Sequence, residues 1–412
     1  MESGTNNLPL KIVWLCHFVN QEMKEYFNAP LVNEMAPWIS KLINLFRNRT
    51  EVELHIVAPN IFNNTDCSFT KDAINYHFYK RIPIPDNNKY VRKIHTILQI
   101  EQITNFIWIK HKIANCIKKI DPDIIHLHGA ENPYYSAGIL PLFDKYPTLI
   151  TIQGFIRNTS DIDPKKKKAI NIEEAILKKT EHICARTDEM RKIILQINPN
   201  ATIHFHNYPI TIPSIVKDNI GRVEPIDCLF FAHVHKDKGI EDLLVAISLV
   251  KTFYPNISLL VIGGTENKYL SYLKNLCSKL NINSNVQFLG FLPTQDDVYK
   301  YAMLAKMCVL PTYHDIIPGT IIESMFMKLP IVAYAVGGIP ELNKKENTVT
   351  LVEKQNINQL AEKIMQLLNN ADLRKSLAEK AFCHAHERFD NSNVVPDLIN
   401  VYKSILKEDI IL

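Results

Sequence analysis

The chain has 412 residues, of which 46% are hydrophobic and 22% are charged, a composition typical of soluble globular proteins. At roughly 100–200 residues per domain, this length predicts two domains or slightly more. No run reaches the roughly 18 consecutive apolar residues of a membrane-spanning helix, which excludes an integral membrane protein. The N-terminus lacks a basic segment ahead of a long apolar one, so we expect a cytoplasmic protein. The eight cysteines show no CxxC spacing, which indicates reduced thiols.

The net charge of +4 is too small to indicate nucleic acid as a partner, and the positive excess lies in residues 1–205, with 26 Lys and Arg against 21 Asp and Glu. Within 88–119, basic residues surround apolar ones that include Phe106 and Trp108. A basic helix with exposed aromatic side chains suits an anionic surface, so this segment predicts peripheral membrane contact. The alternative is a core helix whose lysines face water. We interpret a second basic run, Lys165–Lys168, as a solvated loop.

In the N-terminal half, short apolar runs alternate with longer segments of helical periodicity. This alternation is typical of βαβ units and predicts a parallel sheet. The expected elements in chain order are strand Lys11–Cys16, helix Ala36–Phe46, strand Glu53–Ala58, helix 91–120, strand Ile124–His128, helix Ser136–Tyr146, strand Thr148–Gln153, helix Ile172–Lys179, and strands His182–Arg186 and Thr202–His206.

Residues 207–225 contain three prolines and a glycine, so we interpret them as a linker between an N-terminal domain (1–206) and a C-terminal domain (226–390). Residues 391–412 are predicted to form a helix that crosses back to the N-terminal domain. The fold class is α/β, with two doubly wound Rossmann-like domains that face a central cleft. After the linker we expect strand Cys228–Ala232, helix Gly239–Phe253, strand Ser258–Ile262, helix 268–279, strand Val286–Leu289, helix Asp296–Lys306, strand Met307–Leu310, helix Thr320–Met327, strand Ile331–Tyr334, and helices 356–369, 371–387 and 393–407.

The stretch 309–341 carries the strongest chemical signal. A strand is predicted to end at Leu310, a loop carries Asp315, and a helix begins near Gly319. Free N–H groups at a helix start attract phosphate or sugar hydroxyls, and glycine permits close approach. Asp315 and Glu323 suit hydrogen bonding to the vicinal hydroxyls of a ribose or hexose. The alternative is an acid at a helix N-terminus and a glutamate on a solvated face.

This stretch resembles the E-x7-E region of the retaining GT-B glycosyltransferases of family four, in the variant that reads E-G-x-P-G-x-x-x-E-[AS]. Asp315 and Glu323 stand at the two acidic positions, with Pro318-Gly319 between them. The resemblance covers the C-terminal half nearly end to end and the N-terminal half loosely. The further matching pieces are Phe231–Gly239, Leu260–Gly264, Val286–Phe291, Leu329–Ile331, Val336–Glu341, Arg388–Asp390, Pro122–His128 and Thr151–Gly154.

The resemblance implies a nucleotide-sugar donor held by the C-terminal domain of a GT-B fold. It places Glu323 at the position that binds the donor ribose, and Asp315 where the family's glutamate contacts the transferred sugar. Lys238 stands at the phosphate-binding lysine, and His233 stands at an arginine five residues earlier. The remaining donor positions are the backbone N–H groups of Gly319, Thr320 and Ile321, for the diphosphate and sugar, and Phe291 and Leu292, for the nucleobase.

The resemblance also places His128 at the N-terminal histidine that faces the reaction centre and assists the sugar hydroxyl or the phosphate. His126 and His128 alternate along a predicted strand, and we expect one to face the core and the other the cleft edge. We assign His128 to the cleft; the alternative is a packed histidine. The family's reaction retains configuration, because the acceptor hydroxyl attacks from the face of the leaving phosphate, which takes its proton.

Four departures from the family pattern affect these expectations. Histidine at 233 is neutral over much of the physiological pH range, whereas arginine is permanently charged. Asp315 is one methylene shorter than glutamate. The glycine-rich loop after the first strand is absent at Cys16–Asn20, and Gln153 replaces the histidine of T-x-H-G. These changes motivate the alternative of a catalytically silent partner subunit.

We expect no metal or cofactor, because Lys238 and backbone N–H groups neutralise the diphosphate in this scheme. The two D-x-D triplets, Asp121–Asp123 and Asp161–Asp163, are interpreted as a strand entry and a turn. His384 and His386 lie within one predicted helix at a spacing that does not share a face, so they do not indicate a zinc site.

The sequence thus predicts a hexosyltransferase-type glycosyltransferase that is cytoplasmic and located at the inner face of the membrane. Its expected substrates are a nucleotide-sugar donor and a growing, lipid-linked polysaccharide, such as a capsule or O-antigen (lipopolysaccharide) precursor. No nucleic-acid partner is expected. The alternatives are the silent partner subunit and another GT-B enzyme, such as a nucleotide-sugar epimerase or a phosphorylase.

Overall fold

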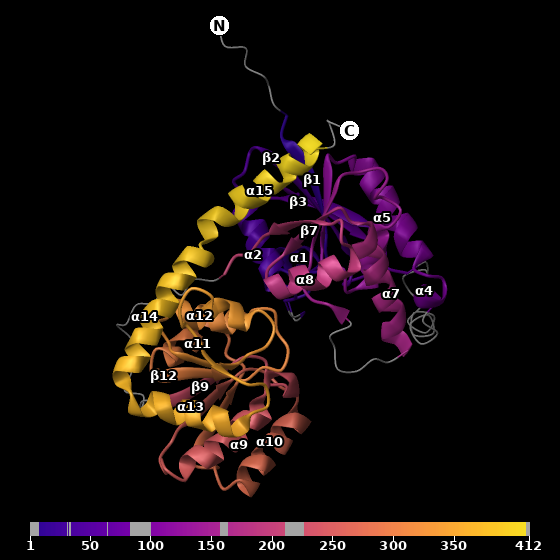
Figure 1. The fold of residues 1–412 in the computed structure, drawn as a ribbon. Coiled ribbons are helices and arrows are strands. Elements are labelled where there is room, and N and C mark those ends of the chain that lie inside the picture. The colour runs from indigo at the N-terminus through magenta and orange to yellow at the C-terminus, as the bar shows by residue number, and fades with distance from the viewer. Residues whose placement is uncertain are drawn as a thin grey trace. The chain divides into compact units, whose positions relative to one another are not determined.

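The computed structural model describes residues 8–30, 32, 34–63, 65–82, 100–156, 164–210 and 226–408, and it divides the chain into two units (Figure 1). Unit 1 comprises Met1–Pro209 together with Asn391–Leu412, and unit 2 comprises Ile210–Asp390. Residues 211–225 of the expected linker and residues 91–99 of the expected helix 91–120 lie outside the described residues.

Unit 1 is built on an eight-stranded sheet in the order β3-β4-β2-β1-β5-β6-β7-β8. Every pairing is parallel except that of β3 with β4. Because β1 lies between β2 and β5, the strand order reverses there, and ligands of such sheets bind beyond the carboxyl ends of strands at this point. The strands are β1 (Leu10–Leu15), β2 (Val52–Pro59), β3 (Cys67–Lys71), β4 (Ile74–Tyr79), β5 (Ile124–His128), β6 (Thr148–Thr151), β7 (His182–Ala185) and β8 (Thr202–Phe205).

The helices of unit 1 depart from the sequence pattern in several places. The helices Gln21–Tyr26 and Asp188–Ile197 were not predicted, and the helix expected from Ile172 begins at Pro164. The segment expected as one helix over 91–120 contains a break at Asn105 and Phe106, whose φ angles are +53° and +58°. The expected helix Ser136–Tyr146 is wrong, since Pro141 removes an N–H donor and disfavours helix continuation. The helical segments are α1 (Gln21–Tyr26), α2 (Pro37–Phe46), α4 (Ile100–Ile103), α5 (Ile107–Ile120), α6 (Pro133–Ser136), the 3-10 turn Ala137–Ile139, α7 (Pro164–Lys179), α8 (Asp188–Ile197) and α15 (Asn391–Glu408).

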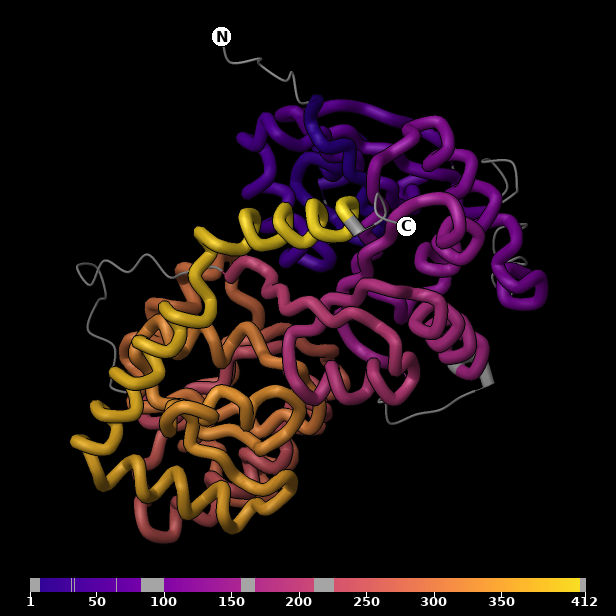
Figure 2. Tube along the Cα trace, turned by 45° about the horizontal axis from the view of Figure 1, so that its top comes forward, coloured from indigo at the N-terminus to yellow at the C-terminus, as the bar shows by residue number. Residues whose placement is uncertain are grey.

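The last helix, α15, completes the core of unit 1 although it is the end of the chain (Figure 2). It buries one apolar face against β1 and α2. Within this core, the Tyr402 hydroxyl accepts a hydrogen bond from Trp14 Nε1 at 2.9 Å and lies 2.6 Å from His126 Nδ1. The buried apolar residues of α15 are Val394, Val395, Leu398, Ile399, Tyr402 and Ile405.

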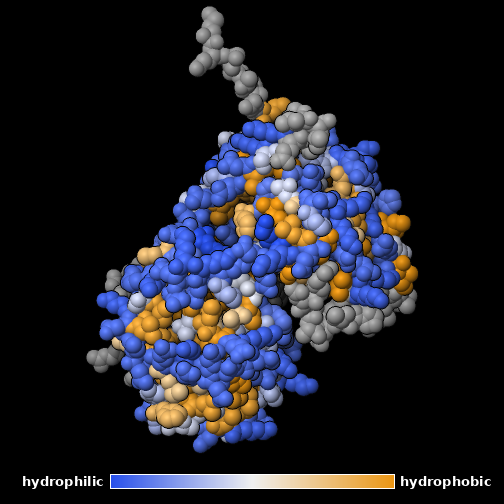
Figure 3. Space-filling view, viewed as in Figure 1, coloured by the Kyte–Doolittle hydropathy of each residue, from blue (hydrophilic) through white to orange (hydrophobic). Residues whose placement is uncertain are grey.

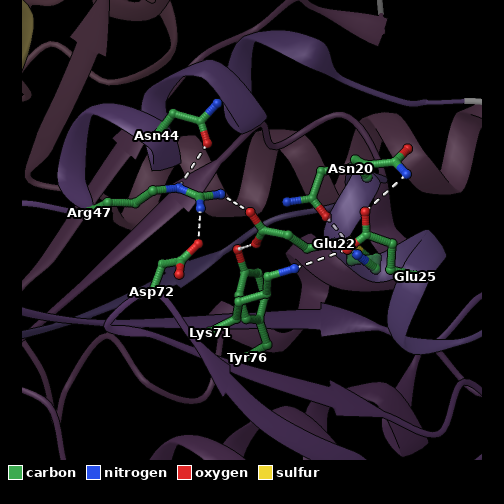
Figure 4. Close-up of polar contacts among 10 residues, drawn as sticks. Asn20, Glu22, Glu25, Asn44, Arg47, Lys71, Asp72 and Tyr76 are labelled. Atoms are coloured by element: carbon green, nitrogen blue, oxygen red, sulfur yellow. Dashed lines mark hydrogen bonds and ion pairs between the residues drawn. The ribbon is translucent and has the colours of Figure 1, made fainter.

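A polar cluster fixes the short helix that follows β1 (Figure 4). Asn20 caps α1 by accepting the N–H of Met23 at 3.0 Å. The buried Glu22 accepts a hydrogen bond from the Tyr76 hydroxyl at 2.6 Å and pairs with Arg47 at the end of α2. These contacts tie α1 to α2 and to the β3–β4 hairpin, neither strand of which was predicted. They hold in place the loop Cys16–Asn20 that follows β1.

Unit 2 is built on a fully parallel six-stranded sheet in the order β11-β10-β9-β12-β13-β14. Here β9 lies between β10 and β12, so the order reverses at β9. The expected helix Asp296–Lys306 ends early, at Ala302, because the following strand begins at Ala305. The elements are β9 (Ile226–Phe231), α9 (Ile240–Lys251), β10 (Leu259–Ile262), α10 (Asn267–Lys279), β11 (Val286–Gly290), α11 (Gln295–Ala302), β12 (Ala305–Leu310), α12 (Gly319–Phe326), β13 (Ile331–Tyr334), β14 (Thr350–Val352), α13 (Ile357–Asn369) and α14 (Ala371–Arg388), with 3-10 turns at Lys236–Lys238 and Ile339–Asn343.

Two parallel-sheet Rossmann-like units therefore confirm the expected α/β class. None of the helices in the described part of the chain combines the length and apolarity that crossing a bilayer requires.

Replacement of Tyr402 by Phe tests the role of α15 in unit 1. The variant leaves the indole N–H of Trp14 buried without its acceptor, which we expect to lower the free energy of unfolding by about 1–3 kcal/mol. Tryptophan fluorescence in urea reports this unit alone, because all three tryptophans of the chain, at 14, 38 and 108, lie in it. Tyr26→Phe, at a half-exposed position, is the matched control. Equal midpoints for the two variants would contradict the expectation.

Candidate functional site

The strongest candidate site lies in unit 2, where the loops after the neighbouring strands β9 and β12 meet. The N–H of Tyr313 donates to the carbonyl oxygen of Asp237 at 2.8 Å, and the Thr312 hydroxyl donates to the same oxygen at 3.2 Å. These bonds join the loop that carries Lys238 to the loop that carries Asp315. The sheet thus brings two of the predicted site residues to the point where its strand order reverses.

Glycines allow these loops to approach so closely. Gly239 has φ +71°, and a Cβ there would lie 1.8 Å from the carbonyl oxygen of Pro311. Gly337 has φ +55°, and a Cβ there would lie 1.7 Å from the carbonyl oxygen of Asp315. Both positions require a left-handed backbone and leave no room for a Cβ atom. Any larger residue at 239 or 337 would therefore push the Asp315 loop away from that position.

The start of α12 presents backbone donors at this place. Pro318 precedes the helix without a side-chain cap, and its carbonyl oxygen accepts the N–H groups of Ile321 at 3.1 Å and Ile322 at 3.3 Å. The N–H groups of Gly319 and Thr320 donate to no other described residue. Two free donors and the positive end of the helix dipole therefore attract an anion, whereas the N–H of Ile321 already has a partner.

Two carboxylates flank these donors. Asp315 forms an ion pair with Lys238, and both side chains are partly buried. Glu323 accepts a hydrogen bond from Gln295 Nε2 at 3.0 Å. The other oxygen of Glu323 lies 3.9 Å from the point that a Cβ on Gly319 would occupy, so this carboxylate faces the start of α12. Cation, free amides and carboxylates thus converge beyond β9 and β12.

The remaining predicted residues of unit 2 extend the site along the sheet edge. His233, in the loop after β9, is exposed, and its ring lies 6.1 Å from that of His235 in a nearly parallel orientation. Phe291 directly follows β11 and is 77% exposed, next to Gly264 at the end of β10. Leu292 is partly buried against the core. An exposed phenyl ring at this edge offers a stacking surface for a planar base.

His128 has a different environment from the one we expected. The histidines at 126 and 128 are both fully buried, and their rings lie 3.8 Å apart. The expectation that they face opposite sides is wrong, because residues two apart on a strand point to the same face. His128 Nδ1 lies 3.0 Å from the Tyr208 hydroxyl. Burial holds the pKa of both histidines well below the usual 6.5, so both rings are neutral at physiological pH.

Sequence reasoning missed a carboxyl group near His128. Glu131 follows β5, and burial raises its pKa to about 7, with a smaller contribution from the charge of Glu173 on α7. Its only signal in the sequence was its position directly after the His128-Gly129-Ala130 turn at the end of a predicted strand.

Two family matches cover most of the chain. Residues 214–383 match the family described as glycosyl transferases group 1. Residues 81–187 match the family described as glycosyl transferase 4-like. The loops of the unit 2 site all fall inside the first segment, and Glu131 falls inside the second.

Curated relatives include three glycosyltransferases. An uncharacterized one from Haemophilus influenzae is 28% identical over 40% of this chain and 46% of its own length. The capsular polysaccharide biosynthesis glycosyltransferase CapM of Staphylococcus aureus is 25% identical over 43% of this chain and 46% of its own. The chain thus spans about half the length of these two relatives. An uncharacterized glycosyltransferase of Methanocaldococcus jannaschii is 24% identical over 82% of this chain and 86% of its own.

Solved structures share the fold at lower identity. A sucrose-phosphate synthase from Thermosynechococcus elongatus has a TM-score of 0.70 and 15% identity, over 97% of this chain and 100% of its own. HepE of Anabaena, in complex with UDP-glucose, has a TM-score of 0.67 and 14% identity, over 98% and 100%. These likenesses show the fold, that of the GT-B glycosyltransferases.

Gly239→Ala tests the close approach of the two loops. A left-handed φ alone costs a non-glycine residue about 1–2 kcal/mol, and the clash with Pro311 adds to it, so we expect unit 2 to be destabilised by at least that amount. Gly319→Ala is the matched control, because its Cβ would meet no atom closer than 3.9 Å. Thermal unfolding followed by circular dichroism compares them. Equal stability of the two variants would show that the loops can separate without loss.

Proposed function

Because this chain joins a glycosyl transferase 4-like segment to a glycosyl transferases group 1 segment, we propose that it is a glycosyltransferase that uses a nucleotide-sugar donor. The observation that carries the proposal is the convergence of Lys238, Glu323 and the free N–H groups of α12 beyond β9 and β12. A cation and oriented amides suit a diphosphate, and a carboxylate beside them suits the hydroxyls of a ribose.

In this proposal the donor lies along the carboxyl edge of the unit 2 sheet. The diphosphate binds Lys238 and the N–H groups of Gly319 and Thr320, and Glu323 accepts hydrogen bonds from the ribose. Phe291 stacks on the base. A structural neighbour binds UDP-glucose, so UDP and UDP-glucose are the first ligands to test.

The ion pair of Lys238 with Asp315 gives donor binding a further consequence. An incoming diphosphate replaces the Asp315 carboxylate as the partner of Lys238. The freed carboxylate then accepts hydrogen bonds from hydroxyls of the transferred sugar. One exchange of partners therefore positions both the leaving group and the sugar.

We further propose that transfer retains configuration and needs no metal. Negative charge develops on the leaving diphosphate, where Lys238 and the start of α12 stabilise it without a divalent cation. The acceptor hydroxyl attacks from the same face, and the leaving phosphate takes its proton. Similarity to the capsular polysaccharide biosynthesis glycosyltransferase CapM supports a polysaccharide acceptor of the capsule type. We propose that this acceptor is lipid-linked and presented at the cytoplasmic face of the membrane.

Nucleotide binding tests the donor site through Glu323. At a hundred times its dissociation constant, UDP should stabilise the protein by about 2.7 kcal/mol, which a thermal-shift assay resolves. We expect Glu323→Ala to lose most of this shift, because the ribose hydroxyls lose their acceptor, and we expect the shift to persist in EDTA. Glu362→Ala, at an exposed position on α13, is the control. Failure of UDP, GDP, ADP and their sugar conjugates to stabilise the wild-type protein would overturn the proposal and favour a silent partner subunit.

Membrane contact is a separate part of the proposal, and its surface differs from the one the sequence indicated. Phe106 is buried and Trp108 is half-buried, whereas Ile103 and Ile107 are 70% and 56% exposed. The basic run 165–168 lies in α7 rather than in a loop, because Pro164 suits a first helical position. Lys168 Nζ donates to the carbonyl oxygen of Gln102 at 2.7 Å, which places its charge beside the exposed isoleucines.

Apolar side chains next to lysines suit the interface of an anionic bilayer. Apolar surface is visible in Figure 3 where Figure 1 draws α5. Residues 88–99 of the segment that the sequence indicated lie outside the described residues.

Vesicle sedimentation tests this surface. The double variant Ile103→Asp and Ile107→Asp should bind vesicles of phosphatidylserine and phosphatidylcholine at least tenfold more weakly than the wild type, since a charged residue replaces each inserted side chain. Phe253→Asp, at a 72% exposed position of unit 2, controls for added charge. Equal binding by all three proteins, or binding that salt does not weaken, would contradict the assignment.

A further inference from the structure

Unit 1 has its own cluster of buried polar atoms beyond the carboxyl ends of β1 and β5. His17 follows β1, and the turn from Gly129 to Glu131 follows β5. Among the described residues, His17 Nε2, His128 Nε2 and Glu131 Oε2 are buried and have no hydrogen-bond partner. Buried polar atoms are normally paired, so unpaired atoms at the reversal point of a parallel sheet indicate a ligand that supplies the partners.

Glycine at 129 brings the polar groups together. Its φ is +92°, and a Cβ there would lie 2.6 and 2.7 Å from the carboxylate oxygens of Glu131 and 2.6 Å from the Tyr135 hydroxyl. That hydroxyl donates its proton to the carbonyl oxygen of His128 at 2.7 Å, so it cannot also donate to Glu131. The ring of His17 lies 6.1 Å from that of Tyr135. The carboxyl of Glu131 therefore lacks a hydrogen-bond donor for Oε2 in the described structure.

The charged groups around this carboxyl are of both signs. Glu173 of α7 is buried, accepts the N–H of Ile156 at 3.1 Å, and contributes to the raised pKa of Glu131. Burial and the charge of Arg81 lower the pKa of His17, so its ring is neutral near pH 7. Burial likewise lowers the pKa of His128. The groups around Glu131 are thus a second carboxyl, the backbone N–H groups of Ala130 and Glu131, neutral histidines and tyrosine hydroxyls. The Arg186 guanidinium lies over the Tyr208 ring, and Arg81 acts on His17.

We propose that Glu131 is a specificity-determining residue that accepts a hydrogen bond from a hydroxyl of an uncharged sugar unit of the acceptor. This assignment rests on the proposed function and names the chemistry of its second substrate. A sugar hydroxyl supplies the donor that Oε2 lacks, whereas a phosphate dianion offers only acceptors. The backbone carbonyl oxygen of His128 holds Tyr135 against Gly129.

Proton linkage follows from this geometry. A hydroxyl donor stabilises the carboxylate more than the carboxylic acid, so sugar binding favours deprotonated Glu131. With a pKa of about 7 in the free protein, the sugar should bind about tenfold more weakly at pH 6 than at pH 8. His128 and His206 do not produce this change, because burial holds their pKa values well below 6.5. Burial and the charge of Arg81 also lower the pKa of His17, and the flat profile expected for Glu131→Gln separates the two groups.

Saturation-transfer NMR measures the binding of sugars to the protein directly, here in the presence of saturating UDP. The neutral probes are glucose, galactose and N-acetylglucosamine, and glucose 1-phosphate is the charged comparison. We expect at least one neutral sugar to bind the wild-type protein with the stated pH dependence. Glu131→Gln should bind it more weakly and with a flat pH profile, because the amide does not titrate. Glu131→Asp should retain the pH dependence. Glu51→Gln, at an exposed position of unit 1, should behave as the wild type.

Each outcome separates this inference from the proposed function. Glu131→Gln must keep the UDP shift and the tryptophan-fluorescence transition of unit 1, which shows that both units are folded. An unchanged pH profile in that variant overturns the role of Glu131. Binding of glucose 1-phosphate in preference to every neutral sugar, or absence of sugar binding while UDP binds, overturns the assigned ligand class. If the wild-type protein binds none of the tested nucleotides, including UDP, the proposed function is overturned instead.

Discussion

The contact between the backbone of Gly239 and the carbonyl oxygen of Pro311 is the constraint on which the unit 2 site depends. It brings the loops after β9 and β12 together. The hydrogen bonds from Tyr313 and Thr312 to the carbonyl oxygen of Asp237 then fix the position of one loop against the other. Only then can a lysine from one loop and an aspartate from the other form an ion pair. A parallel sheet makes such meetings possible because its strands end at the same edge.

Unit 1 follows the same plan with different chemistry. Its strand order reverses at β1, and the groups gathered there are carboxyls, neutral histidines and tyrosines, with Arg81 and Arg186 nearby. Burial determines this contrast, since desolvation keeps the histidines neutral and raises the pKa of Glu131. One unit therefore suits an anionic ligand, and the other suits a neutral ligand rich in hydroxyl groups.

Structural polar networks in unit 1 keep its own strand exits in place. The cluster of Glu22, Arg47 and Tyr76 holds the helix after β1, and the hydrogen bonds of Tyr402 hold α15 against Trp14 and His126. Buried groups of this kind are costly when a partner is removed, so they specify one arrangement of the loops around them.

The sequence by itself determined the two α/β units and the ligand-binding stretch of unit 2, since apolar runs alternate with helical periods and Asp315, Gly319 and Glu323 are close in the chain. Local periodicity did not reveal the β3–β4 hairpin or the break at Asn105, because long-range packing and single backbone angles decide these features. Helix α8 was also missed, although its start carries a local signal, since Thr187 caps it by accepting the N–H of Met190. Only the tertiary structure paired Lys238 with Asp315, seventy-seven positions away, and buried His128 together with His126. It also placed Glu131 beside Tyr135 without a donor. Burial and distance decide which of the candidate groups are charged or unpaired, and these quantities depend on contacts that a linear pattern does not contain.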